Sequence, residues 1–92
     1  MKFPYYSIEF KKNYSSDEIL VSGAIRNYTS KSYNTAVFRI ILYRQSKIIG
    51  SGLIKVHDFK ANITRDFEAV LNISHKVIPR ISGFDIVFDS GF

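Results

Sequence analysis

The sequence of 92 residues contains no cysteine and no tryptophan, and its only histidines are His57 and His75. The lack of cysteine excludes a disulfide scaffold, a thiol nucleophile and a cysteine-ligated zinc site. Because zinc sites in proteins draw their ligands mainly from cysteine and histidine, we expect no metal ion and no cofactor in this protein.

Long apolar segments are missing as well. The longest stretches without Asp, Glu, Lys or Arg have seven residues, as at 19–25 and 48–54. A transmembrane helix requires about 17–25 apolar residues, so we expect no membrane span in this chain. The opening Met-Lys-Phe-Pro-Tyr-Tyr lacks the apolar segment of about 7–15 residues that marks a signal peptide. We therefore expect a cytoplasmic protein, or a surface-exposed domain if the chain is cut from a longer protein.

Apolar residues are nevertheless plentiful. They make up 46% of the chain, and aromatic residues make up 15%, a composition typical of folded proteins. A chain of this length buries about 60–65% of its unfolded surface, which is enough for one core. We expect residues 1–92 to form a single domain.

The charge is positive and unevenly distributed. Thirteen Lys and Arg residues against eight Asp and Glu residues give a net charge of +5, and no carboxylate lies between Glu18 and Asp58. The basic residues in that interval are Arg26, Lys31, Arg39, Arg44, Lys47 and Lys55. A field of this sign favours polyanions and anionic surfaces, but it also keeps a small domain in solution. Both interpretations stay open on the sequence alone.

Alternation of apolar and polar residues predicts strands along most of the chain. The predicted strands are 4–12, 19–27, 36–44, 48–56 and 84–89. In the first of them we expect Tyr6, Ile8 and Phe10 to share one face. The strand at 36–44 has the strongest pattern, with Ala36, Phe38, Ile40 and Leu42 on one side and Val37, Arg39, Ile41 and Tyr43 on the other.

The segment after residue 58 is ambiguous. Five of its apolar residues are spaced like one face of a helix: Phe59, Ile63, Phe67, Val70 and Leu71. Residues 66–73 also alternate, however, so we favour a loop at 58–64 and a strand at 65–74. We expect residues 77–82 to form a loop or a short edge piece. The alternative is an α+β fold with one helix near 59–71.

Six or seven strands separated by turn signals predict an all-β fold. We expect an immunoglobulin-like sandwich of two antiparallel sheets. Because cysteine and tryptophan are absent, its core must come from Ile, Val, Leu and Phe.

Three segments resemble the FxLYD domain family over about residues 19–89. They are Gly23-Ala24-Ile25-Arg26-Asn27, Ile40-Ile41-Leu42-Tyr43-Arg44 and Ile49-Gly50-Ser51-Gly52. Leu42 and Tyr43 match the motif that names the family, whereas Ile40 stands in place of its Phe and Arg44 in place of its Asp. The resemblance implies an immunoglobulin-like sandwich, commonly a module of bacterial or archaeal surface proteins, and it carries over no catalytic residue.

The sequence offers no clear catalytic constellation. His57 is followed by Asp58, and Ser74 by His75, but neighbours on a strand face opposite ways, so neither pair forms a dyad. We expect no enzymatic activity and assign no catalytic residue. Four Asn-x-Ser/Thr sequences begin at Asn13, Asn27, Asn62 and Asn72, and they leave glycosylation at the surface as a further possibility.

The most informative feature is an apolar stripe that cannot enter the core. Val37, Ile41 and Tyr43 alternate with a stripe that must be buried, so another segment covers them or they contact a partner. We expect an interaction surface on the second, third and fourth strands that comprises Val37, Arg39, Ile41, Tyr43, Arg26, Leu53 and Lys55. Leu20 and Ile49 are further candidates for that face.

This surface suggests two functions. The first is a protein-interaction or structural module that uses an apolar, basic-rimmed sheet face for a protein partner or for self-association. The alternative is weak binding of nucleic acid or another polyanion, in which Arg26, Arg39 and Lys55 contact phosphates while Tyr28, Tyr33 and Tyr43 stack on bases. We favour the first, because aliphatic side chains suit protein contacts better than base stacking.

Overall fold

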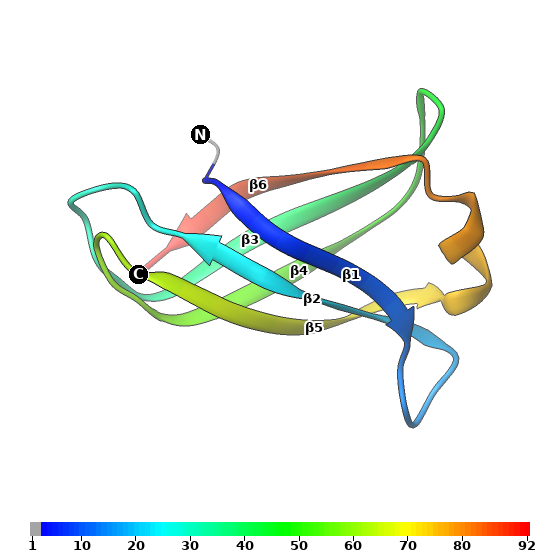
Figure 1. Ribbon diagram of the computed structural model, residues 1–92, viewed down its shortest axis with the longest axis horizontal. Coiled ribbons are helices and arrows are strands. Elements are labelled where there is room, and N and C mark those ends of the chain that lie inside the picture. The colour runs from blue at the N-terminus through cyan, green and yellow to red at the C-terminus, as the bar shows by residue number, and fades with distance from the viewer. Residues whose placement is uncertain (1–2) are drawn as a thin grey trace.

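The computed structural model describes residues 3–92 and contains six strands (Figure 1). The elements are β1 (Tyr5–Lys12), β2 (Glu18–Arg26), β3 (Tyr33–Arg44), β4 (Lys47–Phe59), β5 (Thr64–Ser74), a short 3-10 helix η1 (His75–Arg80) and β6 (Gly83–Gly91). Every strand predicted from alternation is present, and β3 and β4 each extend three residues beyond the predicted range at one end.

The strands form two antiparallel three-stranded sheets that pack face to face. One sheet has the order β1-β2-β5 and the other has the order β4-β3-β6. Figure 1 shows the first sheet in front of the second, with η1 at one end joining β5 to β6. The predicted all-β sandwich of two antiparallel sheets is therefore confirmed.

The core lies between the two sheets, where the alternation predicted it. Ala36, Phe38, Ile40 and Leu42 of β3 are fully buried. From the other sheet β2 contributes Ile19, Val21 and Ile25, and β5 contributes Phe67 and Leu71. Phe38 packs against several other rings, with Phe59 in an edge-on arrangement at a centroid distance of 5.6 Å. Burial of such side chains supplies most of the free energy that holds the sheets together.

A β-bulge in β1 overturns the predicted face of the first strand. Tyr6 pairs with Ala24 and Glu9 pairs with Ser22, so two residues of β1 lie opposite Gly23. One of them, Ser7, has a φ of 56°. The extra residue reverses the alternation, so Ile8 and Phe10 pack toward the core while Tyr6 is half exposed on the outside. The sequence hides this bulge because its left-handed residue is a serine rather than a glycine.

The ambiguous segment after residue 58 is a strand, as we favoured. β4 continues to Phe59, a turn follows, and β5 pairs antiparallel with β2. The alternative prediction of a helix near 59–71, and of an α+β fold with it, is wrong. The helix-like spacing of apolar residues arises from residues that belong to two strands and the turn between them. For residues 77–82 we expected a loop or a short edge piece, but η1 covers 75–80 and only 81–82 lack regular structure. The Ser74 hydroxyl accepts a hydrogen bond from the Lys76 amide at 3.3 Å and caps this helix.

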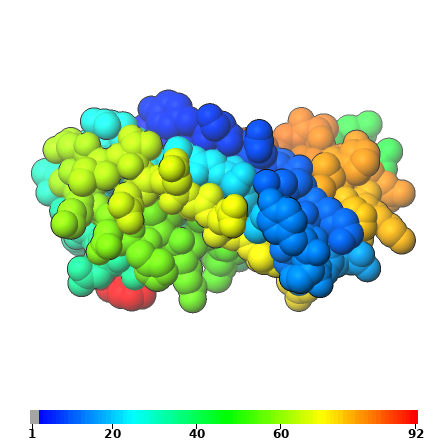
Figure 2. Space-filling model, turned by 60° about the horizontal axis from the view of Figure 1, so that its bottom comes forward, coloured from blue at the N-terminus to red at the C-terminus, as the bar shows by residue number. Residues whose placement is uncertain are grey.

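One long side of the sandwich is closed by close contact between β4 and β5. Gly50 and Gly52 face inward on β4, and a Cβ at these positions would lie 2.5 Å and 2.6 Å from Ile73 and Leu71 of β5. The missing side chains thus leave room for β5 to cover the edge of the other sheet. Figure 2 shows β5 and the adjacent turn, in green to yellow, as one continuous surface.

Asn27 ties the two sheets together at the end where the chain crosses between them. It is fully buried, and its side-chain Nδ2 donates to the Lys31 carbonyl at 2.8 Å and to the Phe59 carbonyl at 3.1 Å. Its Oδ1 accepts from the amide and the hydroxyl of Thr29 at 3.0 Å and 2.6 Å. Its backbone N–H and C=O bond to Ile63 and Asn62 in the turn between β4 and β5. One residue thus holds the β2–β3 loop, the end of β4 and the following turn in place.

The first prediction concerns the core stripe of β3. Phe38→Ala should lower the free energy of unfolding by about 3–5 kcal/mol, because it removes a buried ring and leaves a cavity. Arg39→Ala should lower it by less than about 1 kcal/mol, since the Arg39 side chain is exposed. Denaturant unfolding followed by circular dichroism measures both values. A larger loss for Arg39→Ala would show that the register of β3 is shifted by one residue.

The second prediction concerns Asn27. Asn27→Ala should destabilise the protein by about 2–4 kcal/mol, because it removes the donor to the buried Phe59 carbonyl and to the part-buried Lys31 carbonyl, and an unsatisfied buried group costs about 1–3 kcal/mol. Asn34→Ala, an exposed change on β3, is the matched control and should cost less than about 0.5 kcal/mol. Equal denaturation midpoints for the two variants would contradict a structural role for the Asn27 hydrogen bonds.

Candidate protein-interaction surface

The outward stripe of β3 lies in the middle of an exposed sheet face. We call this surface the outer β3 face and define it by its β3 residues Val37, Arg39, Ile41 and Tyr43, with Leu53 and Lys55 from β4 and Asp85 and Val87 from β6. Six of the seven predicted interaction residues lie on it. Because β3 is the central strand of its sheet, both of its neighbours contribute side chains to the face.

The strand register sets the rows of this face. Arg39 pairs with Leu53 on β4 and with Val87 on β6, so a cation lies between two aliphatic side chains. Leu53 is 44% exposed, whereas Val37 is only 8% exposed and is therefore buried. Ile41 is half-buried. The apolar area that a partner could cover therefore comes mainly from Leu53, Ile41 and Val87.

The predicted placement of Arg26 on this face is wrong. Arg26 ends β2, and β2 belongs to the other sheet. The same holds for Leu20, which is 4% exposed and pairs with Lys11 and Val70. The chain crosses from one sheet to the other between β2 and β3, and alternation within a strand does not report such a crossing. Ile49 packs against the core and does not contribute to the face.

β6 contributes residues that the sequence reasoning did not place on this surface. Asp85 pairs across the sheet with Ile41, and Val87 pairs with Arg39. Both residues alternate with Phe84, Ile86 and Phe88, which is consistent with an outward direction, but alternation does not show that β6 lies beside β3. Since Asp85 and Asp89 carry negative charge along the β6 side, the rim is of mixed sign rather than uniformly basic.

The tyrosines invoked for base stacking do not share a surface. Tyr43 lies on the outer β3 face, whereas Tyr33 is buried against Phe88 at a centroid distance of 5.4 Å. Tyr28 belongs to the β2–β3 loop and packs on Phe3 at 5.2 Å. With Arg26 on the other sheet as well, the proposed contacts to a polyanion are not brought together.

Both histidine rings contact a polar group of a neighbouring segment through Nδ1. His57 Nδ1 lies 3.1 Å from the Thr35 hydroxyl, and His75 Nδ1 lies 3.0 Å from the Asp17 carbonyl. Within residues 3–92 no three of the His, Asp and Glu side chains come close enough together to hold a metal ion. The part of the chain that the structure describes also contains no helix long and apolar enough to cross a membrane.

The four glycosylation sequences are not equivalent in the fold. Asn27 is fully buried and uses its whole amide in hydrogen bonds, so it is not an accessible acceptor in the folded protein. Asn62 and Asn72 are exposed, and Asn13 is half-buried. Thr29, which completes the sequence at Asn27, serves as a hydrogen-bond donor to it.

Comparison with protein-family models, with curated proteins and with solved structures gives no match for this chain. The functional argument therefore depends on the geometry of the chain itself.

Proposed function

We propose that this protein is a non-catalytic interaction module that self-associates through the outer β3 face. The observation that carries the proposal is the row in which Arg39 lies between Leu53 and Val87, with half-buried Ile41 beside it. A sheet face that is open to water normally carries polar residues. Aliphatic side chains that surround a central arginine on such a face are typical of a contact between proteins, because interface cores are apolar and arginine is enriched at interfaces.

The charge pattern supports a second copy as the partner. If two faces pack about a two-fold axis parallel to the strands, β4 of each copy lies over β6 of the other, which makes the contact isologous. Lys55 and Ser90 both pair with Val37, and Asp89 precedes Ser90, so the axis brings Lys55 of each copy toward Asp89 of the other. The basic margin then meets the acidic margin, and such rim pairs act more on specificity than on affinity.

Arg39 lies close to that axis, between the aliphatic side chains of its own row. Asp85 lies on β6 opposite Ile41, two residues along β3 from Arg39. Its carboxylate reduces the repulsion between the Arg39 guanidinium groups of the two copies. Three strands spaced about 4.8 Å apart give a narrow face, so we expect an interface at or below the usual size of about 800 Å² per partner. Association should therefore be weak.

A polyanion ligand is the weaker candidate. Arg39 and Lys55 remain on the face, but Asp85 and Asp89 border it and Arg26 lies on the other sheet. A role as an interaction or structural module also agrees with the resemblance to the FxLYD domain family.

The third prediction tests this interface. Ile41→Asp should weaken self-association at least about tenfold, because it places an unpaired charge in an apolar contact. Ile63→Asp is the matched control, since Ile63 is exposed in the turn between β4 and β5, and it should leave association unchanged. Sedimentation equilibrium over a concentration series measures the association constant of each variant.

Arg39→Glu separates the two candidate functions. It should alter self-association less than Ile41→Asp does, whereas a polyanion binder would lose affinity for a single-stranded oligonucleotide and show a steep salt dependence. A strict monomer at high concentration would overturn the self-association proposal, and retention of the oligonucleotide at low salt would favour the alternative.

A further inference from the structure

The two long sides of the sandwich differ. On one side β4 and β5 contact each other closely, whereas on the other side the edges are β1 and β6. Within residues 3–92, β1 pairs with β2 alone and β6 pairs with β3 alone. The outward N–H and C=O groups of β6 therefore lie along an open edge, which is a template for pairing with another strand.

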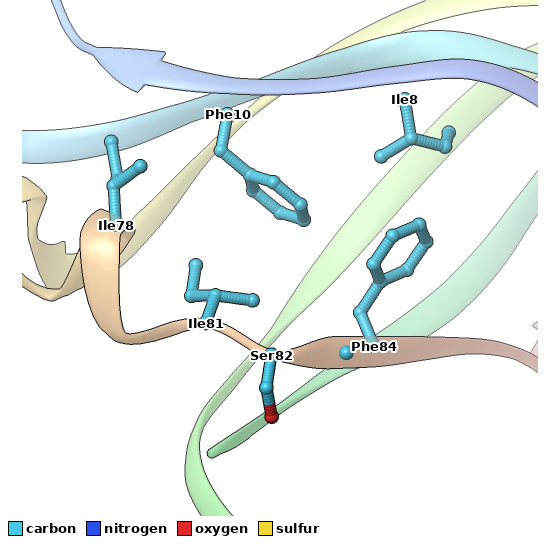
Figure 3. A pocket seen from close by; sticks show the side chains of 7 residues that line it. Ile8, Phe10, Ile78, Ile81, Ser82 and Phe84 are labelled. Carbon is cyan, nitrogen blue, oxygen red and sulfur yellow. The ribbon is translucent and has the colours of Figure 1, made fainter. Parts of the chain in front are cut away.

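An apolar groove lies between these two edges. We call it the β1–β6 groove, and it is lined by Ile8 and Phe10 of β1, Ile78 of η1, Ile81, and Phe84 of β6. Figure 3 shows these side chains pointing toward one another across the gap, while the Ser82 hydroxyl points away from it. That hydroxyl bonds instead to the Gln45 amide and the Tyr43 carbonyl. The volume of the groove is about 310 Å³.

The position of the groove indicates the shape of its ligand. Its volume is at the lower end of the range for small-molecule sites, about 300–1,000 Å³. Polar side chains that could orient a small molecule do not converge on it, since five of its seven lining residues are aliphatic or aromatic and the Ser82 hydroxyl points away. It is instead bordered by a strand edge, and an extended peptide can use such an edge for backbone hydrogen bonds while alternate side chains enter the groove.

The strand order supports the same ligand. The sheets share three strand pairings with an immunoglobulin-type sandwich, namely first with second, second with fifth and third with sixth, although β4 here lies beside β3 rather than beside β5. In that architecture a seventh strand pairs with the free edge of the sixth and covers the gap beside the first. The β1–β6 groove occupies that place here.

We infer that the β1–β6 groove binds an extended polypeptide strand that pairs with β6 and completes the second sheet. The regular part of the edge runs from Gly83 to Phe88, because the pairing with β3 shifts register after Phe88. This length is about 20 Å of strand, enough for six residues. Three of these would point inward, between Phe10 and Ile8 on one side and Phe84 and Ile81 on the other.

The charges of β6 define the partner further. The strand contains Asp85 and Asp89 and no basic residue. Asp85 lies between Phe84 and Ile86, which point toward the core, so its carboxylate faces outward, and Asp89 is exposed just beyond the regular part of the edge. Opposite charges across neighbouring strands are favourable, and like charges are not. The partner is therefore a strand in which apolar residues alternate with basic ones, and the site is distinct from the outer β3 face.

The fourth prediction uses a synthetic peptide in which valine alternates with lysine and threonine over ten residues. Added to the ¹⁵N-labelled protein, it should shift the amide resonances of β6, β1 and η1 and slow hydrogen exchange along β6. The same peptide N-methylated at alternate residues should not bind, because it cannot form the backbone ladder. A variant with glutamate in place of lysine should bind at least about fivefold more weakly, because of repulsion from β6.

Two matched protein variants locate the site. Ile81→Thr should weaken peptide binding about tenfold, because it exchanges apolar contact in the groove for a hydroxyl. Ile48→Thr changes an isoleucine that is 64% exposed on β4, and it should leave the affinity unchanged. Circular dichroism and the thermal midpoint of each variant verify that it is folded.

Several outcomes would overturn the inference. One is the absence of binding at millimolar peptide concentration by a protein that is folded. Another is a set of resonance shifts confined to the outer β3 face. Equal binding of the N-methylated peptide would show that apolar contact alone is responsible. A further outcome is a dimer of the protein that the Ile81→Thr substitution dissociates but that added peptide fails to dissociate. That outcome would assign the groove to a second copy of the chain.

Discussion

The buried amide of Asn27 is the constraint on which the arrangement of the two sheets depends. A sandwich needs the chain to leave one sheet and enter the other, and the crossing exposes backbone groups that a regular strand would satisfy. Asn27 meets this need with both donors and both acceptor positions of its side chain, reaching the β2–β3 loop and the end of β4. A buried polar group whose partners are all present gives the loop one geometry rather than several. The position of β3, and with it the outer β3 face, follows from that geometry.

The sheet that contains β3 carries both proposed surfaces. The outer β3 face uses the outward side chains of β4, β3 and β6, and the β1–β6 groove uses the free edge of the same β6. β6 is therefore shared, and its side chains alternate between the two environments. Phe84 points into the groove, while Asp85 and Val87 belong to the outer face. A strand added at β6 would extend the outer face by one strand and enlarge the area available for contact.

Alternation predicted the strands well because burial on one face of a strand follows a period of two. It identified the inward stripe of Phe38, Ile40 and Leu42, since these side chains are wholly apolar and carry no group that favours the solvent side of the strand. It could not show which strands are neighbours, because antiparallel partners are set by loops and by contacts distant in sequence. For this reason Arg26 was placed on the wrong sheet and β6 was left out of the predicted surface. The groove was also missed, since it is formed by β1, η1 and β6 together and the bulge at Ser7 that turns Ile8 inward has no glycine to mark it.

The same bulge bears on how copies of this protein can assemble. An exposed β1 and an exposed β6 on one molecule could pair from one copy to the next, and such a head-to-tail contact does not close on itself but propagates into a filament. A bulge interrupts the regular row of backbone donors and acceptors on an edge strand and twists it away from a flat partner. In β1 the interruption falls at Ser7 and Ile8, near the middle of the strand, so neither half offers more than a few regular residues. The bulge therefore protects the protein against open-ended polymerisation while leaving β6 accessible.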